Sequence, residues 1–277
     1  ITGLLVLSIV FASCQKDESN TNTDSSAVVE STVELSIANA TADFMAEDDN
    51  EVLMEAAEEK DLLGNFNPET LESHNLLDCA DVTIAPLNGF PKTILINFDS
   101  TCTATNGIVR KGTIRIVISD SIRRSGSTAV MTFENYFVNN FKREGTHTWT
   151  NTSPIGGKSW QRKIVGGKIT APNGLYWLHE STHDVVQTAG VNTRFILLDD
   201  VFSVTGNATI ANAAGMSRTA NIELALQKKY ICRFIDKGRV RFQGPNHFAI
   251  LDYGDGTCDN KAKISIDGYP PREIVLQ

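Results

Sequence analysis

The chain has 277 residues, a formal net charge of −8 and 41% apolar residues, enough to build a sizeable core. The acidic excess is local, because nine Asp and Glu residues lie between Ile37 and Leu63 against one base, Lys60, and nine minus one is the whole excess of eight. No basic stripe is present to displace counterions from phosphates, which argues against a nucleic-acid partner.

The first 13 residues form an apolar run that ends at Cys14. Such a run suits the apolar part of a secretory signal, about 7–15 residues long, and is short for a spanning helix of about 20. The segment Phe11–Cys14 (FASC) resembles a bacterial lipobox, with Phe11 where Leu is usual. We expect residues 1–13 to be a signal peptide clipped at its start and Cys14 to be lipidated. An ordinary secretory signal with a chance cysteine is the alternative.

The residues after Cys14 are polar. Lys16–Glu18 (KDE) is similar to the acidic tag of Bacteroidota lipoproteins exported to the cell surface, and residues 19–26 contain no apolar side chain. Residues 14–36 are therefore expected to be the lipidated cysteine and a flexible tether. Two or three acyl chains would anchor the protein stably, since each buried CH₂ contributes about 0.8 kcal/mol. The predicted location is the cell outer membrane, lipid-anchored and surface-exposed.

Residues 37–63 have apolar residues at helical spacing, with the acids on the other face. Gly64, Asn65 and Pro68 are typical of a helix end, so an acidic helical segment is expected within residues 37–74. Because the apolar stripe is thin and rich in alanine, we favour a helix that packs on the main domain or acts as a spacer. A helix that binds a specific partner is the alternative.

Residues 75–277 have the composition of a β domain. Short runs of β-branched and aromatic residues alternate with turn sequences such as Ser125-Gly126 and Asn173-Gly174. No long helical pattern intervenes, which excludes parallel βαβ units. The sequence predicts a mainly β fold, a large antiparallel sheet or sandwich of about a dozen or more short strands, preceded by the acidic helix.

Four cysteines besides Cys14 lie in an exported chain, and an even number suggests disulfides. Three pairings are possible. We favour Cys79–Cys102 and Cys232–Cys258, because each closes a short loop that contributes roughly 3 kcal/mol in the chain-entropy model. None of these cysteines has the close C-x₂₋₄-C spacing of a zinc site.

Several segments together carry a family resemblance. They are residues 79–84 (CADVTI), 91–98 (PKTILINF), 110–114 (RKGTI), 135–139 (NYFVN) and 251–262 (LDYGDGTCDNKA), the last being the most specific. The chain resembles a family of Bacteroidota lipoproteins that have a lipobox, a short linker and a β-rich body. The resemblance covers most of residues 75–277 and implies a location and a class, without an activity.

The segment His179–His183 (HESTH) matches the H-E-x-x-H signature of zinc hydrolases. On a helix, His179 and His183 would share one face and bind Zn²⁺, with Glu180 as the general base. The flanking Tyr, Trp, Thr and Val residues favour a strand, on which four positions separate the histidines by about 13 Å. We favour a strand with a chance match, and a zinc-dependent hydrolase is the alternative, which requires residues 175–188 to be helical.

Asp252, Asp255 and Asp259 lie in a loop with two glycines that could offer several oxygens to Ca²⁺. The spacing differs from that of an EF-hand loop and no Glu closes it. The favoured interpretation is a turn in which the aspartates bond their own backbone.

Five aromatic residues lie in the central part of the chain: Tyr136, Trp149, Trp160, Tyr176 and Trp177. On one exposed face they could stack on sugar rings, but packing between strands is the favoured interpretation. His74, His147 and His247 are isolated, and no nucleophile elbow, P-loop or dinucleotide fingerprint occurs. We expect a non-enzymatic binding or structural component of the cell envelope without a cofactor. Its partner would be an envelope protein complex or a glycan, and a glycan-binding accessory lipoprotein is the alternative.

Overall fold

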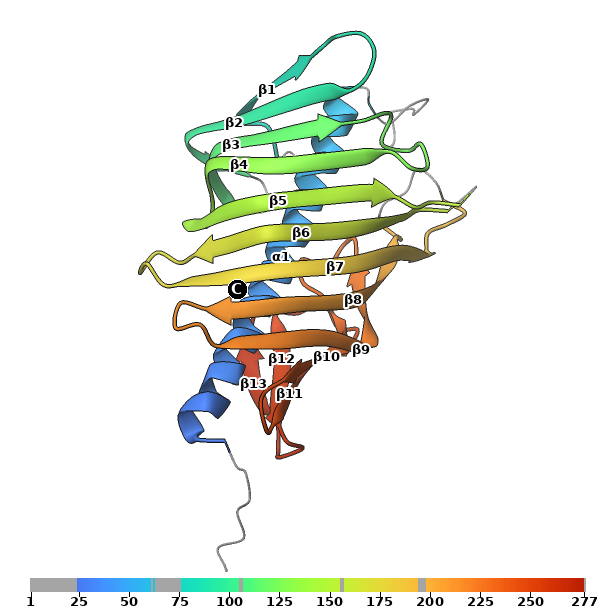
Figure 1. Cartoon of the computed structure of the whole chain (residues 1–277). Helices are drawn as coiled ribbons and strands as arrows, with labels where there is room; N and C mark the ends of the chain where they lie inside the picture. The colour runs from blue at the N-terminus through green and yellow to red at the C-terminus, as the bar shows by residue number, and fades with distance from the viewer. Residues whose placement is uncertain are drawn as a thin grey trace, which may run out of the picture.

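The computed structural model describes residues 24–60, 62, 76–104, 107–154, 157–193 and 198–276, without the side chains of residues 99 and 100. Within these residues one long helix packs on a single sheet of 13 strands (Figure 1). The elements are α1 Ser26–Glu59, β1 Ala80–Ala85, β2 Lys92–Thr103, β3 Val109–Ile118, β4 Thr128–Val138, β5 Phe141–Asn151, β6 Ser159–Thr170, β7 Tyr176–Ala189, β8 Val201–Asn212, β9 Ser217–Lys229, β10 Lys237–Gln243, β11 Phe248–Asp255, β12 Lys261–Ile266 and β13 Arg272–Val275.

Each strand pairs antiparallel with its neighbours in chain order, so the predicted mainly β, antiparallel fold is confirmed as one sheet rather than a sandwich. Several strands are longer than the sequence predicts, because residues that resemble turns lie inside them. Asn135 in β4, Gly166 in β6 and Gly206 in β8 have positive φ angles and sit at register shifts. At Gly206 a Cβ would lie 2.2 Å from the Thr182 carbonyl oxygen, so only glycine fits that bulge.

Helix α1 begins at Ser26, where Ser25 caps its first turn by accepting a hydrogen bond from the Val28 backbone NH. The predicted start at Ile37 is therefore wrong, and the part of the predicted tether from residue 26 to residue 36 is helical. This part has hydroxyl and β-branched residues, which weaken the helical signal in the sequence. The helix ends at Glu59, close to the predicted end.

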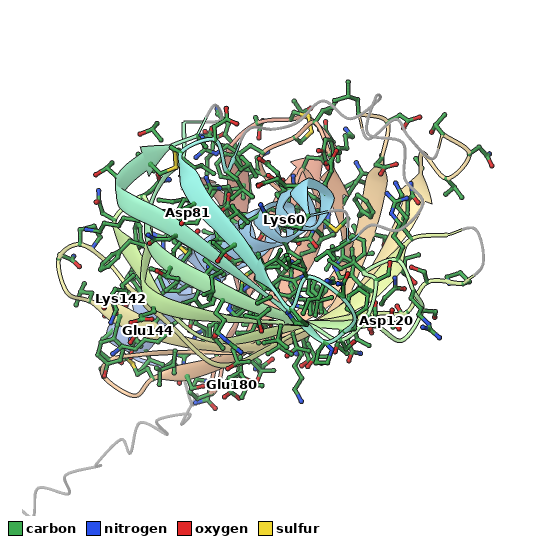
Figure 2. All side chains as sticks on the ribbon, turned by 90° about the horizontal axis from the view of Figure 1, so that it is seen from above. Lys60, Asp81, Asp120, Lys142, Glu144 and Glu180 are labelled. Atoms are coloured by element: carbon green, nitrogen blue, oxygen red, sulfur yellow. A yellow bond between two sulfur atoms is a disulfide. The ribbon has the colours of Figure 1, made fainter. Side chains whose placement is uncertain are left out.

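The helix lies across the strands on the concave face of the sheet (Figure 1). Figure 2 looks along the helix and shows the sheet curving around it, with the Glu180 label on the outer side. A helix of 34 residues is about 51 Å long, and twelve spacings between 13 strands amount to about 58 Å. One helix can therefore contact strands across nearly the whole sheet, and the prediction that it packs on the main domain is confirmed.

The interior has two large apolar clusters. One joins the second half of α1 to β1–β6, and the other joins Val33 and Ala40 of the first half to β7–β13. Both predicted cysteine pairs lie at disulfide distance, with Cα separations of 5.5 Å for Cys79–Cys102 and 5.3 Å for Cys232–Cys258. Among the described residues, no helix has the length and apolarity needed to span a membrane.

Candidate functional site

The acids of α1 are buried against basic side chains of the sheet. We call this set the charged layer; it consists of Asp43, Glu47, Asp48 and Asp49 of α1, Arg110 of β3, Arg143 and His147 of β5, Arg162 of β6, and His179 and His183 of β7, all of them buried. The strand residues occupy inward positions of the period-2 alternation, so their side chains point at the helix. The acidic face of the helix is thus part of the interior.

Three ion pairs join the helix to the sheet in this layer. Glu47 Oε1 accepts from Arg162 Nη1 at 2.5 Å, and Asp49 Oδ2 accepts from Arg143 Nη2 at 2.7 Å. Asp48 pairs with Arg110, and their side chains are 1% and 0% exposed. Buried charges need partners of opposite sign, so the three pairs fix the position of the helix on three different strands.

The three histidines of the layer are held neutral by burial. Burial, followed by the charge of Arg162, lowers the pKa of His183 to about 3, and its Nδ1 accepts from Arg162 Nη2 at 3.1 Å. Burial also lowers the pKa of His147 and His179. His147 Nδ1 lies 3.0 Å from Asp49 Oδ2. The neutral imidazoles of His183 and His147 therefore lie beside the arginines as uncharged polar groups.

Asp43 is the fourth buried acid. Burial raises its pKa to about 7, although Arg162 opposes this, and its Oδ2 accepts from Asn39 Nδ2 at 2.8 Å. The other three acids pair with the three arginines, and the raised pKa of Asp43 reduces the negative charge that it adds near neutral pH. The layer is therefore close to electrically neutral, which suits its position in the core.

A small pocket of about 10 Å³ adjoins the layer between α1 and strands β5, β6 and β7. Arg143, His147 and His179 line it together with Ala42 and Gly167. A space of this size suits about one water molecule and is too small for an organic substrate. The pocket thus offers no binding site for the substrate of a hydrolase.

The zinc motif lies on strand β7, so the helix that a zincin requires is absent from residues 176–189. His179 and His183 point inward, whereas Glu180 is exposed on the outer face, where it accepts from the Gly166 NH at 3.3 Å. The proposed general base and the proposed ligands therefore lie on opposite faces of the sheet. The strand interpretation is confirmed and the zincin geometry is not formed.

The predicted calcium residues each bond their local backbone. Asp252 accepts from the Gly254 NH, Asp255 from the Thr257 NH and Asp259 from the Lys261 NH. Asp252 also pairs with Arg239 at 2.7 Å. The expected bonds to the local backbone are present, but Asp252 and Asp255 lie in strand β11, so the expected turn is wrong for these two residues. Among the described residues the three carboxylates are not one of the groups close enough to hold a metal.

Within the described residues, the only group with the proximity needed to bind a metal is Cys232, Asp236 and Cys258. Its two sulfur atoms form a disulfide, and Asp236 pairs with Lys229 at 3.2 Å. In the oxidised protein this group has no free thiolate to offer a metal.

The five central aromatic residues do not form a stacking platform. Tyr136 and Trp149 are buried, and Trp160 and Trp177 pack against the apolar clusters inside the sheet. Trp177 also donates from Nε1 to Glu34 of the helix. Only Tyr176 is on the outer face, half-buried below Lys168. These five residues, all in the described part of the chain, therefore do not form a shared exposed surface for stacking on sugar rings.

A second polar network was not recognisable from the sequence. The Thr32 hydroxyl lies 2.6 Å from His247 Nε2, and His247 Nδ1 pairs with Asp24, in the order of a hydroxyl–imidazole–carboxylate triad. Thr32 is completely buried, however, and Arg218 Nε donates to the same hydroxyl oxygen at 2.6 Å. The network lacks an accessible nucleophile, so its role is to fasten the start of α1.

Sequence reasoning missed the arginines of the charged layer and treated His147 and His247 as isolated. One signal was available, because Arg162 and Ile164 are two positions apart and therefore share the apolar face of β6. Cys14, the acidic tag and His74 lie outside the described residues.

Comparison with known proteins gives no match: no family model, curated protein or solved structure matches the chain.

Proposed function

We propose that the protein is a lipid-anchored component of the cell envelope that binds a partner without catalysing a reaction. The observation that carries the proposal is the division of roles between the two faces of the sheet. The inward arginines pair with acids of the helix, whereas the outward side chains of the same strands are accessible and mix polar residues with exposed apolar ones such as Leu178, Val186 and Leu224. The resemblance to Bacteroidota lipoproteins and the expected lipidation at Cys14 supply the location, which stays a prediction.

The outer face of the sheet has side chains that suit binding to another protein. One row of cross-strand neighbours from β4 to β9 consists of Val130, Thr148, Lys163, Thr182, Asn207 and Asn221. Most of these side chains are short, so immobilising them on binding loses less rotamer entropy than immobilising long ones. Regular hydrogen-bonding groups on this convex face favour a protein partner in the envelope whose surface follows the curve of the sheet.

The test is affinity isolation of the full tagged chain from detergent-solubilised native membranes, followed by mass spectrometry. We expect the wild type to recover a defined envelope protein that Thr148→Arg does not recover. Thr148 faces outward as the second residue of the row, between Val130 and Lys163, and a long charged side chain there would obstruct a partner bound along the row. Asn192→Arg, in the exposed turn between β7 and β8, is the matched control and should recover the same protein as the wild type.

Equal recovery by all three chains, or no reproducible partner, would contradict the proposal. Metal analysis of the purified chain tests the enzymatic alternative. Stoichiometric zinc that disappears in His179→Ala would replace the binding role by a zinc-dependent one. Cys14→Ser tests the anchor, since this variant should leave the membrane fraction.

A further inference from the structure

Three turns converge on the start of the helix. The Asp24 carboxylate accepts hydrogen bonds from the backbone NH and the Nδ2 of Asn246, at 3.0 and 2.9 Å, in the turn between β10 and β11. At the start of β9, Arg218 donates to the Val28 carbonyl oxygen at 3.0 Å. At the start of β13, Arg272 lies 3.5 Å from Glu30. We call residues 213–216, 244–247 and 267–271 the anchor-side turns.

The anchor-side turns are almost free of charge. Among their 13 residues the only charged one is Asp267, and the others include Met216, Pro245, Pro270 and Pro271. Tyr269 is 71% exposed, so a large amphipathic ring stands in solvent at this end of the sheet. Tyrosine is a residue typical of the boundary between membrane and water, where the ring meets the headgroups.

The turns at the opposite end of the same strands have a different composition. Among the described residues of the turns that follow β9, β7 and β11, the exposed charges are Arg233, Asp199 and Asp259, and they stand beside exposed apolar residues such as Ile231 and Leu198. A charged end is suited to water, and an uncharged end can approach a lipid surface at a lower desolvation cost. The turns at the two ends therefore differ in how many exposed charges they contain.

The chain between Cys14 and the helix limits the distance to a membrane. Asp24 is bound to the sheet, so ten residue steps join it to Cys14. Ten steps reach at most about 35 Å when fully extended. The anchor-side turns, to which Asp24 is bound, are then the part of the described protein held nearest to the lipid.

We propose that the anchor-side turns rest on the lipid surface, with Tyr269 at the level of the headgroups, so that the strands point away from the membrane. This inference rests on the proposed lipidation of Cys14. The sheet would then have a fixed orientation on the membrane. Its outer face would be roughly perpendicular to the lipid surface and open to a partner.

The test uses the lipidated full chain, purified in detergent and returned to vesicles of phosphatidylethanolamine and phosphatidylglycerol. A bimane probe is placed on Tyr269→Cys, and on Asn192→Cys as the matched control at the other end of β8. The 12 residues of β8 span about 40 Å, so contact quenching can distinguish the two positions. We expect a lipid-borne doxyl quencher to reduce fluorescence at position 269 and to leave position 192 unchanged.

Equal quenching at both positions, or none at position 269, would overturn the orientation while leaving the anchor intact. A probe at position 269 that is shielded in native membranes but not quenched in protein-free vesicles would assign these turns to a protein partner and overturn the lipid contact. Mass spectrometry of the mature chain separates the two proposals, because a chain without acyl groups would overturn both. Circular dichroism of each variant checks that it is folded.

Discussion

Ion pairs on the two faces of the sheet have similar geometry and opposite surroundings. Inside, Arg110 and Asp48 pair with side chains that are 0% and 1% exposed. Outside, Arg239 Nε lies 2.7 Å from Asp252 Oδ2, and their side chains are 55% and 31% exposed. The same two residue types therefore serve as interior contacts on one face and as surface contacts on the other.

The difference shows why the helix has one defined position. Burying a charge costs several kcal/mol unless its partner is present, so any shift of α1 that separates the inner pairs is strongly disfavoured. An apolar helix of similar shape could slide along the sheet at a lower cost. We infer that the inner pairs specify the register of the helix more than they add to net stability, whereas the outer pairs mainly keep the surface soluble.

The largest expected effect comes from breaking an inner pair. Arg110→Met removes the partner of Asp48 and leaves a carboxylate in the core, so we expect a loss of about 3–5 kcal/mol in the free energy of unfolding. Urea unfolding at neutral pH, followed by circular dichroism, measures the loss. A cost as small as that of a surface pair would remove the distinction between the two faces.

The double variant Asp48→Leu with Arg110→Met is the matched control. It replaces both charges by apolar groups, and we expect it to recover most of the stability, because a buried pair adds little beyond a well-packed apolar contact. If Arg110→Met alone does not fold, recovery of the folded state in the double variant still identifies the unpaired carboxylate as the cause. A double variant as unstable as the single one would instead indicate a packing role for Arg110.

A second effect follows from the neutral histidines. The pKa of His183 is about 3 in the folded chain and about 6.5 when unfolded, so below pH 6.5 the unfolded state binds the extra proton and stability is lost as pH falls. At pH 5 this loss amounts to about 2 kcal/mol, from 1.5 units at 1.36 kcal/mol each. We expect His183→Gln to lose less stability than the wild type between pH 7 and pH 5, as measured by urea unfolding at each pH.

Asp43 acts with the opposite sign. Its folded pKa of about 7 lies above the unfolded value of about 3.8, so its contribution to stability is present at low pH and is lost as pH rises towards 7. Asp43→Asn should therefore steepen the acid loss that His183→Gln reduces. Parallel pH profiles for the wild type and both variants would show that neither group titrates differently in the folded state.

Much of the fold could be predicted from local patterns. The alternation in the strands depends on neighbouring residues, and each cysteine pair closes a short loop, with sequence separations of 23 and 26 residues. Both patterns led to the observed sheet and disulfides. The bulges at Asn135, Gly166 and Gly206 could not be separated from turns, because both need the same backbone conformation. The start of α1 was missed because its hydroxyl-rich first turns are stabilised by Arg218 and His247, which lie 186 and 215 residues from Thr32 in sequence.

The charged layer was harder to predict for a related reason. A charge on a strand or a helix is normally evidence of a solvent-facing position, so each side of the interface was assigned to the surface separately. Glu47 and Arg162 are 115 residues apart in sequence. Burying either charge without the other would be strongly destabilising. Inward arginines such as Arg162 become informative only when an acidic helix is available to pair with them.

The smallest expected effect is on the outer face. Arg239→Gln removes the partner of Asp252 but leaves that carboxylate in water and bonded to the Gly254 NH, so we expect a loss of less than about 1 kcal/mol. In about 1 M salt, where the screening length is near 3 Å, the difference from wild type should disappear. Urea unfolding at low and high salt provides both values. A loss comparable to that of Arg110→Met would contradict the comparison. Exposed and buried ion pairs would then contribute equally to stability, and the outer pairs would also position elements of the fold.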